Sequence, residues 1–221
     1  MNELYTMKPI VLENGVIKPI IKFDDFSDII DVFKEPPYGE PLTLFDKIDE
    51  YNGYVYHGLA LGYYNNEGEI MGYAGLMDEV EDEHSPYFHE GVKFLTPLYI
   101  YGLATKSQFR GHGVCSTLVK TVNELAKKQQ TDFIYLRIND SESMSESLCR
   151  KQGYGDLYQD GEIVLQDVSD VDGKISENTL PSANLRRFLI MPITDKGEKF
   201  LSKTGSIKKP AKGKTLVKTM K

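Results

Sequence analysis

The stretch QFRGHG, Gln108 to Gly113, has the residue types of a loop that binds phosphate, and we call it the glycine loop. Its two glycines lie between an apolar run that predicts a strand and a periodic apolar run that predicts a helix. Glycine lets the backbone approach an anion closely, and the free N–H groups at a helix N-terminus attract one. Arg110 adds a positive charge. The question is therefore which phosphate-bearing ligand such a loop would hold.

Two common nucleotide loops fit the sequence poorly. A P-loop needs Gly, four residues, then Gly-Lys-Ser/Thr, and no such string occurs. A dinucleotide fingerprint needs G-x-G-x-x-G directly after a strand and an acid further on. Gly111, Gly113 and Ser116 come near that pattern and Asp140 follows the next predicted strand, but the third glycine is missing. A glycine turn that only ends a strand is the structural alternative.

Hydrophobic periodicity predicts the elements that must position this loop. Strands are predicted at 16–23, 53–64, 69–77, 94–105, 132–138, 162–168 and 186–193. Helices are predicted at 26–33, around 44–48, from 114 to 126, and from 141 to a stop at Gly153, with Asp24 or Asp25 capping the first. An antiparallel run thus precedes one strand–loop–helix–strand crossover. This order predicts a mixed α/β fold and excludes a repeating βα series.

Several segments in this order resemble one family. The run LATKSQFRGHGVCSTLVK resembles motif A of the GNAT N-acetyltransferase superfamily, whose pattern Gln/Arg-x-x-Gly-x-Gly/Ala is matched by Gln108, Gly111 and Gly113. LCRKQGY, ending at Tyr154, resembles the family segment Leu-Tyr-x-Lys-x-Gly-Phe, while EPPYGE and FLIMPI resemble a helix link and the closing strand. The resemblance covers roughly residues 16 to 195. It implies a central, mostly antiparallel twisted sheet flanked by helices.

The same resemblance implies acetyl-CoA as the co-substrate. Its pyrophosphate would lie against backbone N–H groups at the start of the helix after the glycine loop. Its pantetheine arm would pair with the preceding strand like an added strand. We expect His112 to be a solvent-facing loop residue. The expected cofactor-binding residues are Leu103, Ala104, Thr105, Gln108, Phe109, Arg110, Gly111, His112, Gly113 and Val114.

The implied reaction is direct acyl transfer to a primary amine, which needs a base and can use an acid. Cys149 stands where the family has its acidic tyrosine. A thiol with an ordinary pKa of about 8.5 could donate a proton, or Cys149 could be a small buried apolar residue. Tyr154, Tyr158 or Ser147 could serve instead, or no acid is needed because a thiolate leaves readily.

The base is expected in the acidic segment 78–90, which precedes the strand before the glycine loop. We select Glu81 from its candidates, which are Glu79, Glu81, His84 and Glu90. Together with PPYGE, this segment predicts an electronegative acceptor cleft suited to a cationic amine: a polyamine, an aminoglycoside, a lysine or a protein N-terminus. A metal site at His84 and His89 is conceivable, but nothing in the spacing requires one, and no metal is expected.

Composition limits the other functions. The chain has 221 residues, a net charge of −7 and two cysteines without a C-x-x-C pair, which predicts a cytoplasmic protein with free thiols that does not bind nucleic acid through its body. The sequence contains no apolar stretch of about eighteen residues, so no membrane span is predicted. We expect one domain at 1–200 and a basic, disordered tail at 201–221, which could contact nucleic acid. A homodimer is left open.

The alternative function is a catalytically inert CoA-binding module with a regulatory or scaffolding role. It is favoured by Cys149 and by Glu142, which replaces an asparagine that contacts the cofactor arm in many family members.

Overall fold

A computed structural model describes residues 7–30, 47–48, 51–52, 58–77, 95–139, 143–159, 161–167 and 185–207. The strands are β1 (Ile10–Leu12), β2 (Gly15–Pro19), β3 (Gly58–Tyr64), β4 (Ile70–Met77), β5 (Pro97–Thr105), β6 (Phe133–Asn139), β7 (Gly155–Asp156), β8 (Tyr158–Gln159), β9 (Glu162–Ile163), β10 (Leu165–Asp167) and β11 (Leu185–Pro192). The helices are α1 (Phe23–Ile30), α3 (Val114–Lys128), α4 (Ser143–Lys151) and α5 (Asp195–Lys203).

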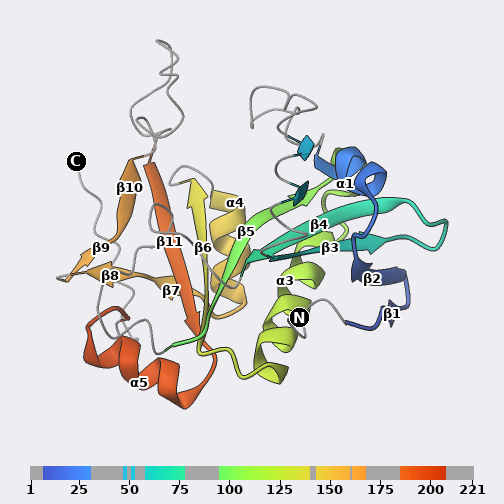
Figure 1. The fold of residues 1–221 in the computed structure, drawn as a ribbon. Coiled ribbons are helices and arrows are strands. Elements are labelled where there is room, and N and C mark those ends of the chain that lie inside the picture. The colour runs from blue at the N-terminus through green and yellow to red at the C-terminus, as the bar shows by residue number, and fades with distance from the viewer. Residues whose placement is uncertain are drawn as a thin grey trace, which may run out of the picture.

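Nine of these strands form one sheet in the order β1-β2-β3-β4-β5-β6-β11-β10, with β7 beside β11. All its described neighbours are antiparallel except β5 and β6, which run parallel. A parallel pair needs a long crossover, and here the glycine loop and α3 supply it. Helices flank the sheet, which confirms the predicted mixed α/β fold (Figure 1).

Strands β5 and β6 stay together over only part of their length. Their register pairs Pro97 to Ile100 with Phe133 to Leu136. Beyond Ile100, β5 keeps its pairing with β4, as far as Thr105 opposite Gly72. In Figure 1, β5 leans away from β6 towards β4. Residues Tyr101–Thr105 therefore present an edge that no described strand pairs on the β6 side, and we call this the open edge.

The crossover helix α3 anchors this region to the core. Its apolar residues recur at helical spacing, and Val114, Leu118 and Val122 are buried on one stripe. They pack in one apolar cluster with Leu98 and Ile100 of β5. On the other face, α1 buries Phe26, Ile29 and Ile30 in a separate cluster with residues of β3 and β4. The start of α3 is thus held rigidly beneath the glycine loop.

Several element boundaries differ from the sequence prediction. The first helix begins at Phe23, so Asp24 and Asp25 lie inside its first turn, where they complement the helix dipole, and are not its cap. The expected strand at 162–168 divides into β9 and β10. The sequence analysis did not predict α5. Because α5 buries Leu201 completely, the expected boundary after residue 200 falls inside a packed helix.

The helix α5 is attached through Asp132, which immediately precedes β6. Its carboxylate accepts hydrogen bonds from the Thr194 hydroxyl at 2.6 Å, the Thr96 N–H at 3.0 Å and the Lys196 ammonium at 3.0 Å. In return, the Asp132 N–H donates to the Thr96 carbonyl at 2.9 Å. Thr96 immediately precedes β5, so this cluster fastens the closed end of the β5–β6 pair.

The pKa of Asp132 lies below its ordinary value. Burial of the carboxyl raises the pKa, but the hydrogen bonds from Thr194 and Thr96 and the charge of Lys196 together lower it by more than burial raises it. A carboxyl with a depressed pKa in the folded state contributes stability above its unfolded pKa. That contribution is lost as the pH falls through the folded pKa.

We therefore expect Asp132→Ala to lower the free energy of unfolding at neutral pH by about 3 kcal/mol, because hydrogen bonds to a buried charge are the strong ones. Chemical denaturation followed by circular dichroism measures this. The exposed Asp195→Ala, on the same end of α5, should cost less than about 1 kcal/mol. An Asp132→Ala penalty that stayed constant from neutral pH down to strongly acidic pH would contradict the assignment.

Candidate functional site

The glycine loop leads directly into the N-terminus of α3. A 3-10 turn at Ser107–Phe109 precedes two glycines in the left-handed region, Gly111 with φ 82° and Gly113 with φ 78°. Gly113 caps α3, and Thr117 donates to its carbonyl at 2.9 Å. The amides before Thr117 lie in the first helical turn, whose N–H groups have no partner inside a helix. Within the loop, the N–H groups of Phe109, Arg110 and His112 donate to backbone carbonyls. The donors offered to an anion are therefore those of the first turn of α3, at the positive end of the helix dipole.

Space around the two glycines is open. A Cβ atom added at Gly111 or Gly113 would meet no heavy atom within 4 Å. The glycines are therefore required by backbone conformation, because a left-handed φ strains other residues. The open space also leaves room for a ligand above the loop.

Polar side chains hold the glycine loop to the rest of the molecule. Gln108 donates to the Glu69 carboxylate at 2.8 Å, and the Lys106 ammonium lies 2.7 Å from Asp28 and 3.9 Å from Glu69. These contacts join the glycine loop to the start of β4 and to α1. Sequence reasoning missed Glu69, Asp28 and Lys106, because 39 and 78 residues separate the bonded pairs and no local pattern marks them. His112 is exposed, as expected for a loop residue.

The expected cofactor-binding residues come together in one continuous segment. The open edge carries Leu103, Ala104 and Thr105, and the glycine loop follows it directly. Arg110 turns back so that its Nε lies 3.4 Å from the Thr105 carbonyl. The structure thus places the strand edge and the helix N-terminus side by side, as an elongated ligand with an anionic end requires.

Cys149 is buried, although it stands at the position expected for an acid. Its side chain is 0% exposed within the apolar cluster under α3. Burial raises the pKa of the Cys149 thiol to about 12, with the nearby Cys115 adding to the effect. Burial likewise raises the pKa of Cys115, on the first turn of α3, to about 11. These properties are those of a packed thiol.

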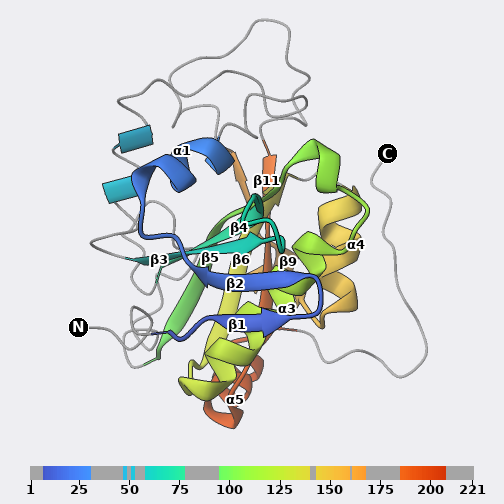
Figure 2. The same ribbon diagram turned by 90° about the vertical axis from the view of Figure 1, so that its right-hand side faces the viewer.

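Tyr154 is committed to a buried hydrogen bond. It is 3% exposed, and its hydroxyl donates to the Asn123 side-chain oxygen at 2.8 Å. Burial raises the pKa of Tyr154, and the nearby Cys149 adds to the effect. Helices α3 and α4 lie side by side here, as Figure 2 shows, and Gln152 donates to the Ser116 hydroxyl at 3.3 Å. Tyr154 and Gln152 therefore fasten α4 to α3.

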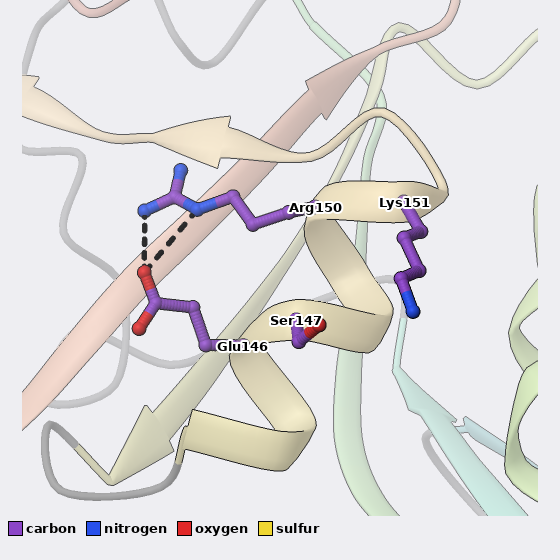
Figure 3. A pocket seen from close by; sticks show the side chains of 4 residues that line it. All are labelled: Glu146, Ser147, Arg150 and Lys151. Atoms are coloured by element: carbon purple, nitrogen blue, oxygen red, sulfur yellow. Dashed lines mark hydrogen bonds and ion pairs between the residues drawn. The ribbon is translucent and has the colours of Figure 1, made fainter. Parts of the chain in front are cut away.

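Ser147, another candidate acid, lies in an open hollow on α4 with Glu146, Arg150 and Lys151 (Figure 3). Arg150 bonds Glu146 at 2.9 Å and Asp156 at 2.5 Å, and Arg187 approaches Glu146 at 3.3 Å. Figure 3 shows the Arg150 guanidinium directed at Glu146. The hollow is thus bordered by an ion-pair network that joins α4 to β7 and β11. Tyr158, the last candidate, lies on β8 and is half-buried.

The remaining candidates lie outside the described residues. These are the base candidates Glu79, Glu81, His84 and Glu90, together with Glu142 and His89. Within the described ranges, no three His, Cys, Asp or Glu side chains form a group that could hold a metal ion. Among the helices that the structure describes, none has the length and apolar character needed to cross a membrane.

Comparisons with known proteins give one consistent result. The sequence profile of the acetyltransferase (GNAT) family matches residues 24–154. No curated protein sequence matches. Among solved structures, the ribosomal-protein-S18-alanine N-acetyltransferase from Escherichia coli is similar in fold, with a TM-score of 0.56, 11% identity, and coverage of 80% of this chain and 93% of that chain.

Two further solved structures contain the cofactor. An acetyltransferase from Bacillus subtilis in complex with CoA has a TM-score of 0.55 and 17% identity, covering 80% of this chain and 98% of that chain. An acetyltransferase from Salmonella typhimurium with acetyl-CoA has a TM-score of 0.56 and 13% identity, covering 81% of this chain and 94% of that chain. These likenesses concern the fold.

Burial of Cys149 leads to a direct prediction. A maleimide reagent should label Cys149 in the native protein only as fast as the protein opens, and the half-exposed Cys115 should react faster. Peptide mass spectrometry after timed quenching separates the two sites. Cys149→Ala should cost about 1 kcal/mol of unfolding free energy through the small cavity it leaves. Rapid native labelling of Cys149, equal to that of Cys115, would show that the thiol faces solvent.

Proposed function

Because this chain belongs to the acetyltransferase (GNAT) family, we propose that it moves an acetyl group from acetyl-CoA to a primary amine by direct attack. The observation that best supports this proposal is that the open edge leads into the glycine loop at the N-terminus of α3. The CoA and acetyl-CoA complexes of the structurally similar proteins support the choice of ligand.

The residues present fit acetyl-CoA at both ends of the site. Its pyrophosphate would lie above Gly111 and Gly113, where the surroundings are open and the first-turn N–H groups of α3 have no partner inside the helix. Arg110 adds positive charge beside the loop. Its pantetheine arm contains amides, which can pair with the open edge as an added strand would. Bound there, acetyl-CoA supplies the activated acyl group.

The open edge would also assist the chemistry. The amine nitrogen attacks the thioester carbon, the C–S bond breaks, and its electron pair leaves on sulfur as a thiolate. In this proposal, backbone N–H groups near the point where β5 parts from β6 polarise the carbonyl oxygen, which gains charge in the transition state. A cationic amine loses two protons from its nitrogen, one before the attack and one as the amide forms; the proposed base takes up one, and the thiolate or solvent takes up the other.

Proton donation by a side chain is not required in this scheme. Cys149 holds its proton too tightly, with a pKa of about 12, and is buried. The Tyr154 hydroxyl already donates a hydrogen bond to the Asn123 side-chain oxygen. Both would support the reaction by packing α4 against α3, and a thiolate leaves without prior protonation. We retain Glu81 as the proposed base, on the grounds of its place in the acidic segment before β5.

The acceptor is proposed to be a small molecule or peptide that carries a cationic amine, because the acidic segment 78–90 precedes β5. Its candidates are polyamines, aminoglycosides, lysine side chains and protein N-termini. We propose a cytoplasmic location, because free cysteines are typical of a reducing compartment. We also propose that a basic tail, and not a second domain, follows the acetyltransferase domain.

A CoA-binding module without catalysis is the second candidate, and the burial of Cys149 at the position of the family acid favours it. A thiol-release assay with a chromogenic reagent separates the two. Acetyl-CoA would be offered with spermidine, kanamycin, a lysine peptide, free N-terminal peptides and a neutral amine. Amine-dependent thiol release supports the enzyme. CoA binding without release for any amine would favour the module.

The glycine loop provides a sharp test of cofactor binding. Gly113→Ala should raise the KM for acetyl-CoA at least about tenfold, since the strained backbone withdraws its N–H donors from the phosphates. Gly161→Ala is the matched control, with φ 87° and equally open surroundings in the turn between β8 and β9. It should lose comparable stability and keep its KM. Equal KM values for both variants would separate the loop from the cofactor.

A further inference from the structure

A β-bulge at Tyr101 sets which side chains of β5 face the cofactor. The register shifts there, because Gly102 opposes Gly75 whereas Ile100 opposes Leu76. Before the shift, Leu98 and Ile100 face α3, and after it Leu103 does. The even positions therefore face α3 before the bulge and the odd positions face it afterwards. Such an extra residue re-aims the side chains around it.

Tyr101 is directed to the face opposite α3. Its ring makes an edge contact with Tyr99, with centroids 5.9 Å apart, and Tyr99 stacks on Tyr135 of β6 at 4.7 Å. Tyr99 and Tyr135 are buried in the cluster on that opposite face, where α5 packs. Tyr101 itself is 40% exposed. The stacked rings of Tyr99 and Tyr135 therefore support the exposed phenol of Tyr101. This phenol immediately follows Ile100, the last residue of β5 that pairs with β6.

This position matters because the cofactor and the acceptor must approach the thioester from different sides. The glycine loop and α3 occupy one face of the sheet. An arm lying along the open edge brings its acyl end towards the place where the strands part. An amine that approaches the carbonyl from the opposite face then meets the exposed Tyr101.

We propose that Tyr101 contacts the acceptor amine, its hydroxyl oxygen accepting a hydrogen bond from the attacking nitrogen and so directing the nitrogen lone pair at the thioester carbon. The inference rests on the proposed acetyl transfer. The N–C bond forms and the C–S bond breaks as described above, and Tyr101 is unchanged at the end. Cys149 and Tyr154 lie in the cluster on the α3 side and cannot serve this face.

The test compares Tyr101→Phe with Tyr63→Phe. The first variant removes the hydroxyl and keeps the ring on Tyr99. The second removes a hydroxyl from a tyrosine buried in the α3-side cluster. Thiol release is measured against amine concentration at saturating acetyl-CoA, and CoA affinity is measured by calorimetry. Tyr101→Phe should lower kcat/KM for the amine at least about tenfold, with CoA affinity and Tm unchanged. Tyr63→Phe should leave kcat/KM within about twofold.

The outcomes separate this inference from the function on which it rests. An active wild type with equally active Tyr101→Phe would overturn the role of Tyr101 and leave acetyl transfer standing. A loss of CoA affinity in Tyr101→Phe, parallel to the loss of turnover, would assign Tyr101 to the cofactor and also overturn it. A wild type that binds CoA and acetylates no amine would overturn both proposals.

Discussion

The parting of β5 from β6 after Ile100 is the constraint on which the site depends. Backbone groups inside a fold need hydrogen-bond partners, so a sheet that opens must either face water or accept another chain-like ligand. Here the open edge leads through the glycine loop to the N-terminus of α3, whose first-turn N–H groups have no partner inside the helix. One parted strand pair therefore provides both halves of a site for a long molecule with amides at one end and phosphates at the other.

Three features of the structure determine where β5 and β6 stay paired and where they part. The carboxylate of Asp132 joins the starts of β5 and β6 to α5, which holds the closed end together. The bulge at Tyr101 bends β5 where the pairing stops, and β4 keeps its hydrogen bonds to the bent half. At the far end, Gln108 and Lys106 attach the loop to Glu69 and Asp28. The opening is thus a rigid feature of the sheet.

Local patterns predicted most of the fold. The apolar stripe from Val114 predicted α3, and the strands predicted at 53–64 and 69–77 contain β3 and β4, because hydrophobic periodicity is a local property. The helix α5 was missed because only Gly197 and Leu201 of its nine residues are buried, which is too weak an apolar stripe to be recognised in the sequence. Its stability comes from Asp132, a residue 62 positions away from its partner Thr194.

In the site, too, some features follow from local sequence patterns and others depend on tertiary packing. The glycine loop follows from a short motif, whereas the open edge depends on where β5 parts from β6, and burial of Cys149 depends on how α3 and α4 pack. The bulge at Tyr101 is a register shift between two strands, which no single-strand pattern specifies. Sequence therefore predicts the segment that we propose for the cofactor, and tertiary packing decides which side chains are exposed beside it.

Hydrogen exchange measured by mass spectrometry, with and without CoA, tests the central claim most directly. The account predicts slower exchange with CoA at two places, the amides of Tyr101–Thr105 and those of Gly111–Ser116. Exchange should stay unchanged in the paired half of β5, from Pro97 to Ile100, and in β11. Binding of CoA that protected neither segment, or that protected only residues outside them, would contradict the assignment of the open edge and the glycine loop as the cofactor site.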